Sequence, residues 1–128
     1  MIVDVVAAII RDNDKILISQ RSDNVHLPGL WEFPGRKVEP DESLQAALER
    51  EIREELGVTI LVQDKFFTVE HNYTSKSVRL HFFNCSIVEG EPQPLEVADI
   101  RWVRPGELGR FEFPPADADL ISILRHSD

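Results

Sequence analysis

Residues 35–58 constrain the fold and the chemistry of this chain more than any other stretch. A Pro-Gly turn leads into a short loop, where Asp41 or Ser43 can cap a helix, because their side-chain oxygens accept hydrogen bonds from free backbone N–H groups. Gly57 marks the end of this helix. Between these signals, apolar residues recur at spacings of three and four and predict one stripe that faces a core. Its members are Leu44, Ala47, Leu48, Ile52 and Leu56.

Three glutamates, Glu51, Glu54 and Glu55, lie beside this stripe. At about 100° per residue they share one side of the helix, where their like charges repel each other. Helix stability gains nothing from this arrangement, whereas a bound cation removes the repulsion. The alternative is an ordinary solvated acidic face, since opposite charges four residues apart, such as Arg50 and Glu54, are common on exposed helices.

Composition indicates a globular protein of one domain. The chain has 128 residues, of which 42% are hydrophobic and 29% are charged, so it is long enough to bury a core. Its net charge of −9 argues against a surface that binds polyanions, but a nucleotide can bring magnesium to an acidic site. The one cysteine, Cys85, fits a reducing compartment, and its strand-like surroundings predict a buried, inert thiol.

The start of the chain, residues 1–10, is apolar but contains Asp4 and has no basic region before it. This pattern predicts neither a signal peptide nor a membrane span. We therefore expect a cytoplasmic protein.

Apolar and alternating runs on both sides of the helix predict a β-sheet. A polar loop is expected over residues 21–30, and a second helix after Pro114 and Pro115, with Leu120, Ile121 and Leu124 on one side. Strands around two helices favour a mixed sheet with a helix on each face, an α/β or α+β arrangement. The predicted strands cover residues 2–10, 15–20, 31–33, 58–62, 65–70, 77–88 and 99–103.

The stretch over residues 35–58 closely resembles the Nudix box. That signature reads Gly, five residues, Glu, seven residues, then Arg-Glu-apolar-any-Glu-Glu-any-Gly-apolar, and so many fixed positions form a strong signal. The matching residues are Glu42, Arg50, Glu51, Ile52, Glu54, Glu55, Gly57 and Val58.

The chain departs from this signature at its first glycine. That position falls on Arg36, and Gly35 stands one residue earlier. A glycine in a tight loop often has a positive φ or a close backbone neighbour. Arg36 therefore either strains the loop or extends its side chain toward a bound phosphate.

The resemblance implies a Nudix fold, an α/β/α sandwich with a mixed central β-sheet, in a single domain over residues 1–128. It also implies Mg²⁺ as the cofactor, with Mn²⁺ as a substitute, held by the box glutamates and a backbone carbonyl of the preceding loop. Arg50 becomes an orienting partner for a box glutamate, and Glu42 helps to fix the loop. The metal-binding candidates carried over by position are Gly35, Glu51, Glu54 and Glu55.

The resemblance extends to the MutT-like branch of the family and covers nearly the whole chain. Arg21, Leu-Trp-Glu-Phe-Pro-Gly over residues 30–35 and Phe-Pro-Pro-Ala-Asp over residues 113–117 all resemble that branch. Asp117 stands where the branch contacts the base, although it can also be the N-cap of the last helix. Glu96, six residues before Trp102, matches a late glutamate of the metal site. It is expected to bind metal or activate water, with a solvated loop acid as the alternative.

Further residues are candidates for substrate binding. Arg21 and Arg36 can bind phosphate, since a guanidinium forms charge-assisted hydrogen bonds with phosphate oxygens. Phe33 and Tyr73 can line or stack on a base, although aromatic residues in strands usually belong to the core. The carboxylate of Asp117 accepts hydrogen bonds, and when protonated it also donates one.

The resemblance implies a magnesium-dependent nucleoside triphosphate pyrophosphohydrolase that removes oxidised or surplus nucleotides. The expected substrate is 8-oxo-dGTP, and the alternative is (d)CTP or a modified pyrimidine nucleotide, because Trp-Glu-Phe and Asp117 also resemble the CTP pyrophosphohydrolase branch. An alternative of another class is a catalytically weak module that binds a nucleotide or oxidised guanine. We expect no direct contact with nucleic acid or membrane, and a monomer or homodimer.

Overall fold

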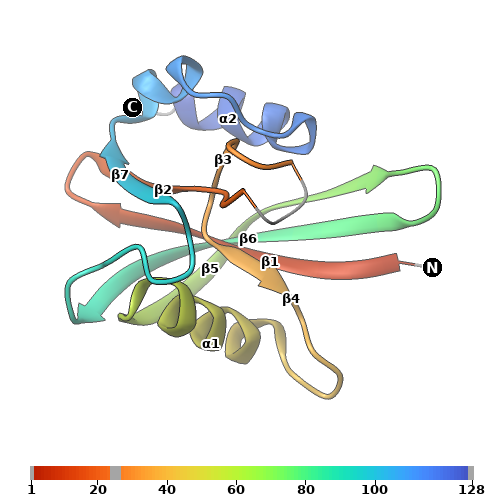
Figure 1. Cartoon of the computed structure of the whole chain (residues 1–128), viewed down its shortest axis with the longest axis horizontal. Helices are drawn as coiled ribbons and strands as arrows, with labels where there is room; N and C mark the ends of the chain where they lie inside the picture. Colours follow the sequence, from red (N-terminus) through yellow and green to blue (C-terminus); the bar gives the residue numbers. More distant parts are fainter. Residues whose placement is uncertain (1, 24–26, 127–128) are drawn as a thin grey trace.

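The computed structural model describes residues 2–23 and 27–126. It shows a mixed β-sheet with α1 (Leu44–Leu56) on one face and α2 (Ala118–Arg125) on the other (Figure 1). The predicted sandwich is confirmed. Residues 24–26 of the loop expected over residues 21–30 lie outside the described residues.

Within the described residues, seven strands form the sheet, and two short 3-10 helices, Pro105–Arg110 and Pro115–Asp117, precede α2. The strands are β1 (Ile2–Asp12), β2 (Lys15–Gln20), β3 (Trp31–Glu32), β4 (Gly35–Lys37), β5 (Thr59–Asn72), β6 (Ser77–Glu89) and β7 (Asp99–Val103).

Strand β1 is the centre of the sheet. It pairs in parallel with β6, from Ile2 opposite Ser77 to Ile10 opposite Cys85. On its other edge it pairs antiparallel with β4 and then with β2. The outer strands are also antiparallel, because β5 pairs with β6, while β3 and β7 pair with β2. The pairing with β4 ties the loop before α1 directly to the central strand.

Two details differ from the sequence prediction. Residues 35–37, expected as a turn and loop, form strand β4, which at three residues is too short to show any periodicity. The strands expected separately over residues 58–62 and 65–70 form one strand, β5, which begins at Thr59. Its register with β6 shifts between Val62 and Lys65 and again between Lys65 and Phe67, and such bulges interrupt the alternation in the sequence.

The ends of α1 follow the predicted signals. Ser43 rather than Asp41 caps the helix, since its side-chain oxygen accepts a hydrogen bond from the N–H of Ala46 at 3.1 Å. Gly57 ends the helix in the left-handed conformation, with φ of 73°. Both ends of the helix that carries the three glutamates are therefore fixed locally.

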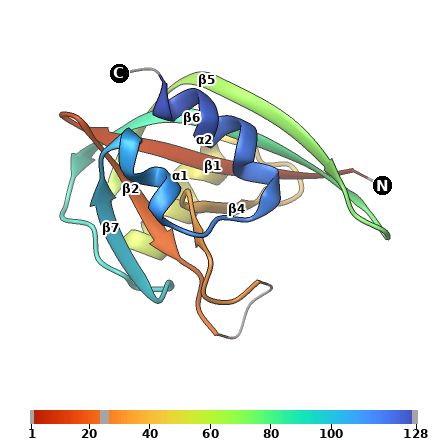
Figure 2. The same cartoon turned by 90° about the horizontal axis from the view of Figure 1, so that it is seen from above.

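Helices α1 and α2 cover opposite faces of the sheet (Figures 1 and 2), and alternation along β1 builds a core under each helix. Val6, Ala8 and Ile10 face α1, while Ala7 and Ile9 face α2. The predicted helix stripes are confirmed, and each fully buried Leu or Ile side chain stabilises the fold by roughly 1.5–3 kcal/mol. Those without solvent exposure are Leu48, Ile52 and Leu56 in α1 and Leu120 and Leu124 in α2, with Leu44 and Ile121 at the margins.

Cys85 is buried in β6, as predicted, and burial raises the pKa of its thiol to about 12. Such a thiol is inert at neutral pH. Among the described residues, no helix has the length and apolar character that a membrane crossing requires.

Candidate active site

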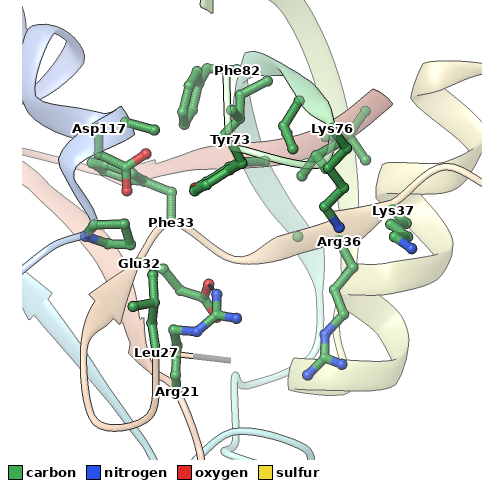
Figure 3. Close-up of a pocket in the computed structure, with 18 of the residues that line it drawn as sticks. Arg21, Leu27, Glu32, Phe33, Arg36, Lys37, Tyr73, Lys76, Phe82 and Asp117 are labelled. Atoms are coloured by element: carbon green, nitrogen blue, oxygen red, sulfur yellow. Dashed lines mark hydrogen bonds and ion pairs between the residues drawn. The ribbon is translucent and has the colours of Figure 1, made fainter. Parts of the chain in front are cut away.

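A cavity of about 750 Å³ lies against β1, β3, β4 and the turn between β5 and β6 (Figure 3). Its aromatic end contains Phe33, Tyr73 and Phe82 together with Asp117. Arg36 and Lys37 lie on the opposite side, near α1. One cavity thus joins an apolar surface suited to a flat ring with a charged surface.

The aromatic end is a packed layer with one exposed member. Phe33 is buried and stacks on Phe113 with ring centres 5.4 Å apart, while its edge contacts Phe82 at 5.9 Å. Tyr73 extends from the end of β5 and is 40% exposed. Both predicted aromatic residues, Phe33 and Tyr73, line the cavity. Phe33 also belongs to the core, which was the alternative prediction for it.

Asp117 lies immediately before α2 and is only 4% exposed. It occupies the N-cap position, but its side chain makes no capping hydrogen bond. Its carboxylate instead points toward the aromatic end of the cavity (Figure 3). Burial raises its pKa to about 7, and the negative charge of Glu32 adds to the shift, while Arg21 opposes it. Asp117 therefore exists in both protonation states near neutral pH.

Arg21 and Glu32 form an ion pair at the cavity wall, with Nη1 of Arg21 2.6 Å from Oε1 of Glu32. Burial raises the pKa of Glu32, and Arg21 opposes that shift. The predicted phosphate ligand Arg21 therefore has a carboxylate partner in this structure. Glu32 is a residue of this site to which the sequence prediction assigned no role of its own. An acid between two buried aromatic residues, Trp31 and Phe33, is the signal that marks it.

Arg50 connects the glutamates of α1 to the preceding loop. Its Nε and Nη2 donate to the two carboxylate oxygens of Glu42, and its Nη1 donates to Glu51 at 2.8 Å and to Glu54 at 3.4 Å. Glu42 also accepts a hydrogen bond from the backbone N–H of Glu39 at 3.0 Å. These contacts agree with an orienting function for Arg50 and a loop-fixing function for Glu42.

Glu55 is fully buried, and neither of its carboxylate oxygens has a hydrogen-bond partner among the described residues. A positively charged neighbour of Glu55 is Arg36, whose Nε lies 3.4 Å from Oε2 of Glu55. Burial raises the pKa of Glu55 well above its ordinary value, the charges of Glu32 and Glu51 raise it further, and Arg36 lowers it.

Glu96 reaches the same region from the loop between β6 and β7. The backbone N–H groups of Leu95 and Glu96 donate to the carbonyl oxygen of Glu55, at 3.0 and 3.3 Å. The exposed side chain of Glu96 lines the cavity. The fold thus brings Glu96, from a distant part of the chain, beside the last turn of α1.

Comparison with known proteins decides the family. The family model described as NUDIX domain matches residues 5–122. The chain belongs to the Nudix family.

Its relatives within this family include two enzymes of Escherichia coli (strain K12). The chain is 39% identical to CTP pyrophosphohydrolase, with 93% of this chain and 88% of the relative covered. It is 32% identical to 8-oxo-dGTP diphosphatase, with 94% and 93% covered. The crystal structure of MutT protein from Methanosarcina mazei Go1 superposes with a TM-score of 0.86 at 31% identity, covering 96% of this chain and 92% of that one.

This Nudix chain accommodates Arg36 without backbone strain. The described non-glycine residues with positive φ are Asn13, Leu27 and Asp41, so the strained alternative for Arg36 is wrong. The unusual conformation lies at Gly35, with φ of 148°. A Cβ atom there would lie 1.9 Å from the carbonyl oxygen of Val6, and only glycine fits.

The carboxylates of the Nudix box fit a magnesium ion. Among the described residues, no three His, Cys, Asp or Glu side chains converge as a metal-binding group, and Arg50 and Arg36 lie against the glutamates. Mg²⁺, however, takes only one or two carboxylates and completes its shell with waters and substrate phosphates. The two oxygens of Glu55, buried without a hydrogen bond, are donors of the required kind.

Proposed function

We propose that this Nudix protein is a magnesium-dependent nucleoside triphosphate pyrophosphohydrolase that converts a (d)NTP and water to the monophosphate and pyrophosphate. One observation carries the proposal: a single cavity joins an aromatic end that contains a buried acid to the residues beside the box glutamates. We also propose that residues 1–128 form one domain. The lone buried cysteine supports a location in the reducing cytoplasm.

One or more magnesium ions would be held by Glu51, Glu54, Glu55 and Glu96, each ion taking one or two of these carboxylates, with the backbone carbonyl of Gly35 as a further ligand. When bound, Mg²⁺, or Mn²⁺ in its place, offsets phosphate charge, orients a water molecule and stabilises charge that develops at phosphorus. The oxygens of Glu55, which are buried without a hydrogen bond from the described residues, support this assignment.

The reaction forms one bond between a water oxygen and a phosphorus atom and breaks the bond from that phosphorus to a bridging oxygen. Glu96 is the proposed base that accepts the proton of the water, since its exposed side chain lines the cavity beside α1. Arg21 and Arg36 are the proposed phosphate ligands. Arg50 holds Glu51 and Glu54 in position through the hydrogen bonds described above.

The base would occupy the aromatic end, in contact with Phe33 and Tyr73, where Asp117 reads its hydrogen-bonding edge. We propose 8-oxo-dGTP as the substrate, in a role that removes oxidised nucleotides. The alternative is (d)CTP or a modified pyrimidine nucleotide, and the greater identity to CTP pyrophosphohydrolase than to 8-oxo-dGTP diphosphatase of the same bacterium supports it.

The test is pyrophosphate release from a panel of nucleotides, with and without magnesium. We expect magnesium-dependent turnover, with kcat/KM highest for 8-oxo-dGTP or for dCTP. Equal kcat/KM for 8-oxo-dGTP and dGTP would reject the sanitising role. No turnover, together with tight binding of a duplex that contains oxidised guanine, would instead support the binding module, against which the net charge of −9 argues.

A further inference from the structure

Arg36 and Glu55 form an ion pair between β4 and α1 that follows from the departure of this chain from the Nudix signature. The Nε of Arg36 lies 3.4 Å from Oε2 of Glu55. The Glu55 side chain is fully buried, whereas that of Arg36 is 44% exposed. A glycine at position 36, as the signature has it, provides no charge at this place.

In the described part of the chain, Arg36 is the cation that forms an ion pair with Glu55. Arg50 is engaged with Glu42, Glu51 and Glu54. Among the described residues, Glu55 has no hydrogen-bond donor on either oxygen. A guanidinium beside a buried carboxylate offsets part of the cost of burying its negative charge. The guanidinium thus supplies part of the charge compensation that a metal ion supplies in a metal-bound site.

We infer that Arg36 is an internal counter-ion of Glu55 that a divalent cation must displace. The inference rests on the proposed metal-dependent function. Two positive charges repel each other at this distance, so the guanidinium and the metal compete for the carboxylate. The displaced Arg36 side chain can move into the cavity that the triphosphate is proposed to enter, because this half-exposed side chain already lines that cavity.

This competition couples metal binding to nucleotide binding. A triphosphate offers the displaced guanidinium new acceptor oxygens and restores its charge-assisted hydrogen bonds. Nucleotide therefore raises the affinity for metal in the natural chain, and part of that increase depends on Arg36. By linkage, metal raises the affinity for nucleotide by the same factor.

The experiment is calorimetric titration of the full chain with Mg²⁺ and with Mn²⁺, in the absence of nucleotide. Arg36→Gln removes the charge at nearly constant length, and Arg36→Gly restores the signature residue. Arg53→Gln is the matched control, since Arg53 is an exposed residue of α1 with no ion pair to a box glutamate among the described contacts. We expect about tenfold tighter metal binding for both Arg36 variants and no change for Arg53→Gln.

A second titration is made in the presence of a non-hydrolysable nucleotide analogue. We expect the analogue to tighten metal binding by a larger factor in the natural chain than in Arg36→Gln. Arg36→Lys, which keeps the charge, is expected to retain most of the weak metal binding of the natural chain. Tighter binding in Arg36→Gly alone would assign the effect to the backbone and would overturn the inference.

The two proposals fail in different ways. If turnover requires magnesium while the natural chain and Arg36→Gln bind metal equally, the counter-ion inference is wrong and the proposed function stands. If no variant binds metal and turnover is independent of magnesium, the proposed function itself is wrong, and the inference falls with it.

Discussion

Arg50 donates hydrogen bonds to both carboxylate oxygens of Glu42, from Nε at 2.7 Å and from Nη2 at 2.9 Å. Its third donor, Nη1, is left for Glu51. One guanidinium therefore fixes the position of the loop before α1 relative to a proposed metal ligand. A planar fork of donors suits this arrangement, because the three N–H groups of an ammonium diverge from one nitrogen atom and do not match two carboxylate oxygens in parallel.

Arg50→Lys should accordingly lower kcat by about 10- to 100-fold while the fold is retained. The charge is kept, but Glu51 loses its fixed orientation. Steady-state kinetics and circular dichroism measure the two quantities. Arg53→Lys, on the exposed side of the same helix, is the control and should match the natural chain. Equal kinetics for Arg50→Lys would show that the fork has no positioning role.

Glu54→Gln should reduce activity far more than stability. The side chain is 47% exposed and makes only a 3.4 Å contact with Arg50, so little folding free energy depends on its charge. A proposed metal ligand, by contrast, loses its affinity for the cation when the carboxylate becomes an amide. We expect kcat/KM to fall by about 100-fold or more, and the urea midpoint to stay nearly constant. A parallel loss of activity and stability would indicate a structural acid.

Gly35→Ala should destabilise the fold by about 3 kcal/mol or more. The added Cβ would lie 1.9 Å from the backbone oxygen of Val6 and 2.7 Å from the Cα of Ala7, and φ at this position is 148°. Gly106→Ala is the matched control, since its Cβ would meet nothing within 4 Å. Urea unfolding of both variants checks the difference, and similar free energies of unfolding would contradict the close approach of β4 to β1.

Asp117 should make the protein less stable as pH rises. Its folded-state pKa of about 7 is above the ordinary value of 3.8, so the native state holds a proton that the unfolded chain has lost between these values. The free energy of unfolding should therefore fall by about 3 kcal/mol from pH 5 to pH 8 through this group. Asp117→Asn, which does not titrate, should lack this component. Urea unfolding at both pH values measures it, and identical pH slopes would refute it.

The same titration should change the preference for the base. Below pH 7 the protonated carboxyl can donate to an acceptor such as O6 of a guanine, whereas above pH 7 the carboxylate only accepts, as from the amino group of cytosine. The ratio of kcat/KM for dCTP over 8-oxo-dGTP should rise by about tenfold from pH 6 to pH 8. Asp117→Asn should show a constant ratio. If the natural chain also has a constant ratio, Asp117 does not read the base.

Helix α1 and its glutamates were predictable because their signals are local. Ser43, the apolar stripe and Gly57 each act within a few residues of the helix, so spacing alone reveals them. The Nudix signature then placed the loop and Arg50 in relation to the glutamates. The structure adds the hydrogen bonds by which Arg50 joins Glu42 of the loop to Glu51 of the helix.

Features that depend on contacts between distant segments could not be predicted from the sequence. Strand β4 exists because β1 pairs with it, and nothing in residues 35–37 alone indicates a strand. The continuity of β5 could not be predicted because bulges in its pairing with β6 interrupt the alternation of the sequence. Glu32 and Asp117 come from different parts of the chain, and the effect of Glu32 on the pKa of Asp117 depends on the folded cavity. For Arg36 the sequence left strain and phosphate binding open, and the ion pair with Glu55 required the structure.

Main-chain atoms make the hydrogen bonds that hold Glu96, in the loop after β6, beside α1. The N–H groups of Gln93, Leu95 and Glu96 donate to the carbonyl oxygens of Leu56 and Glu55, which the helix leaves without partners of its own. Any residue except proline can make these hydrogen bonds. The side chains at positions 93 and 95 are therefore free to vary through mutation while Glu96 stays in place beside α1.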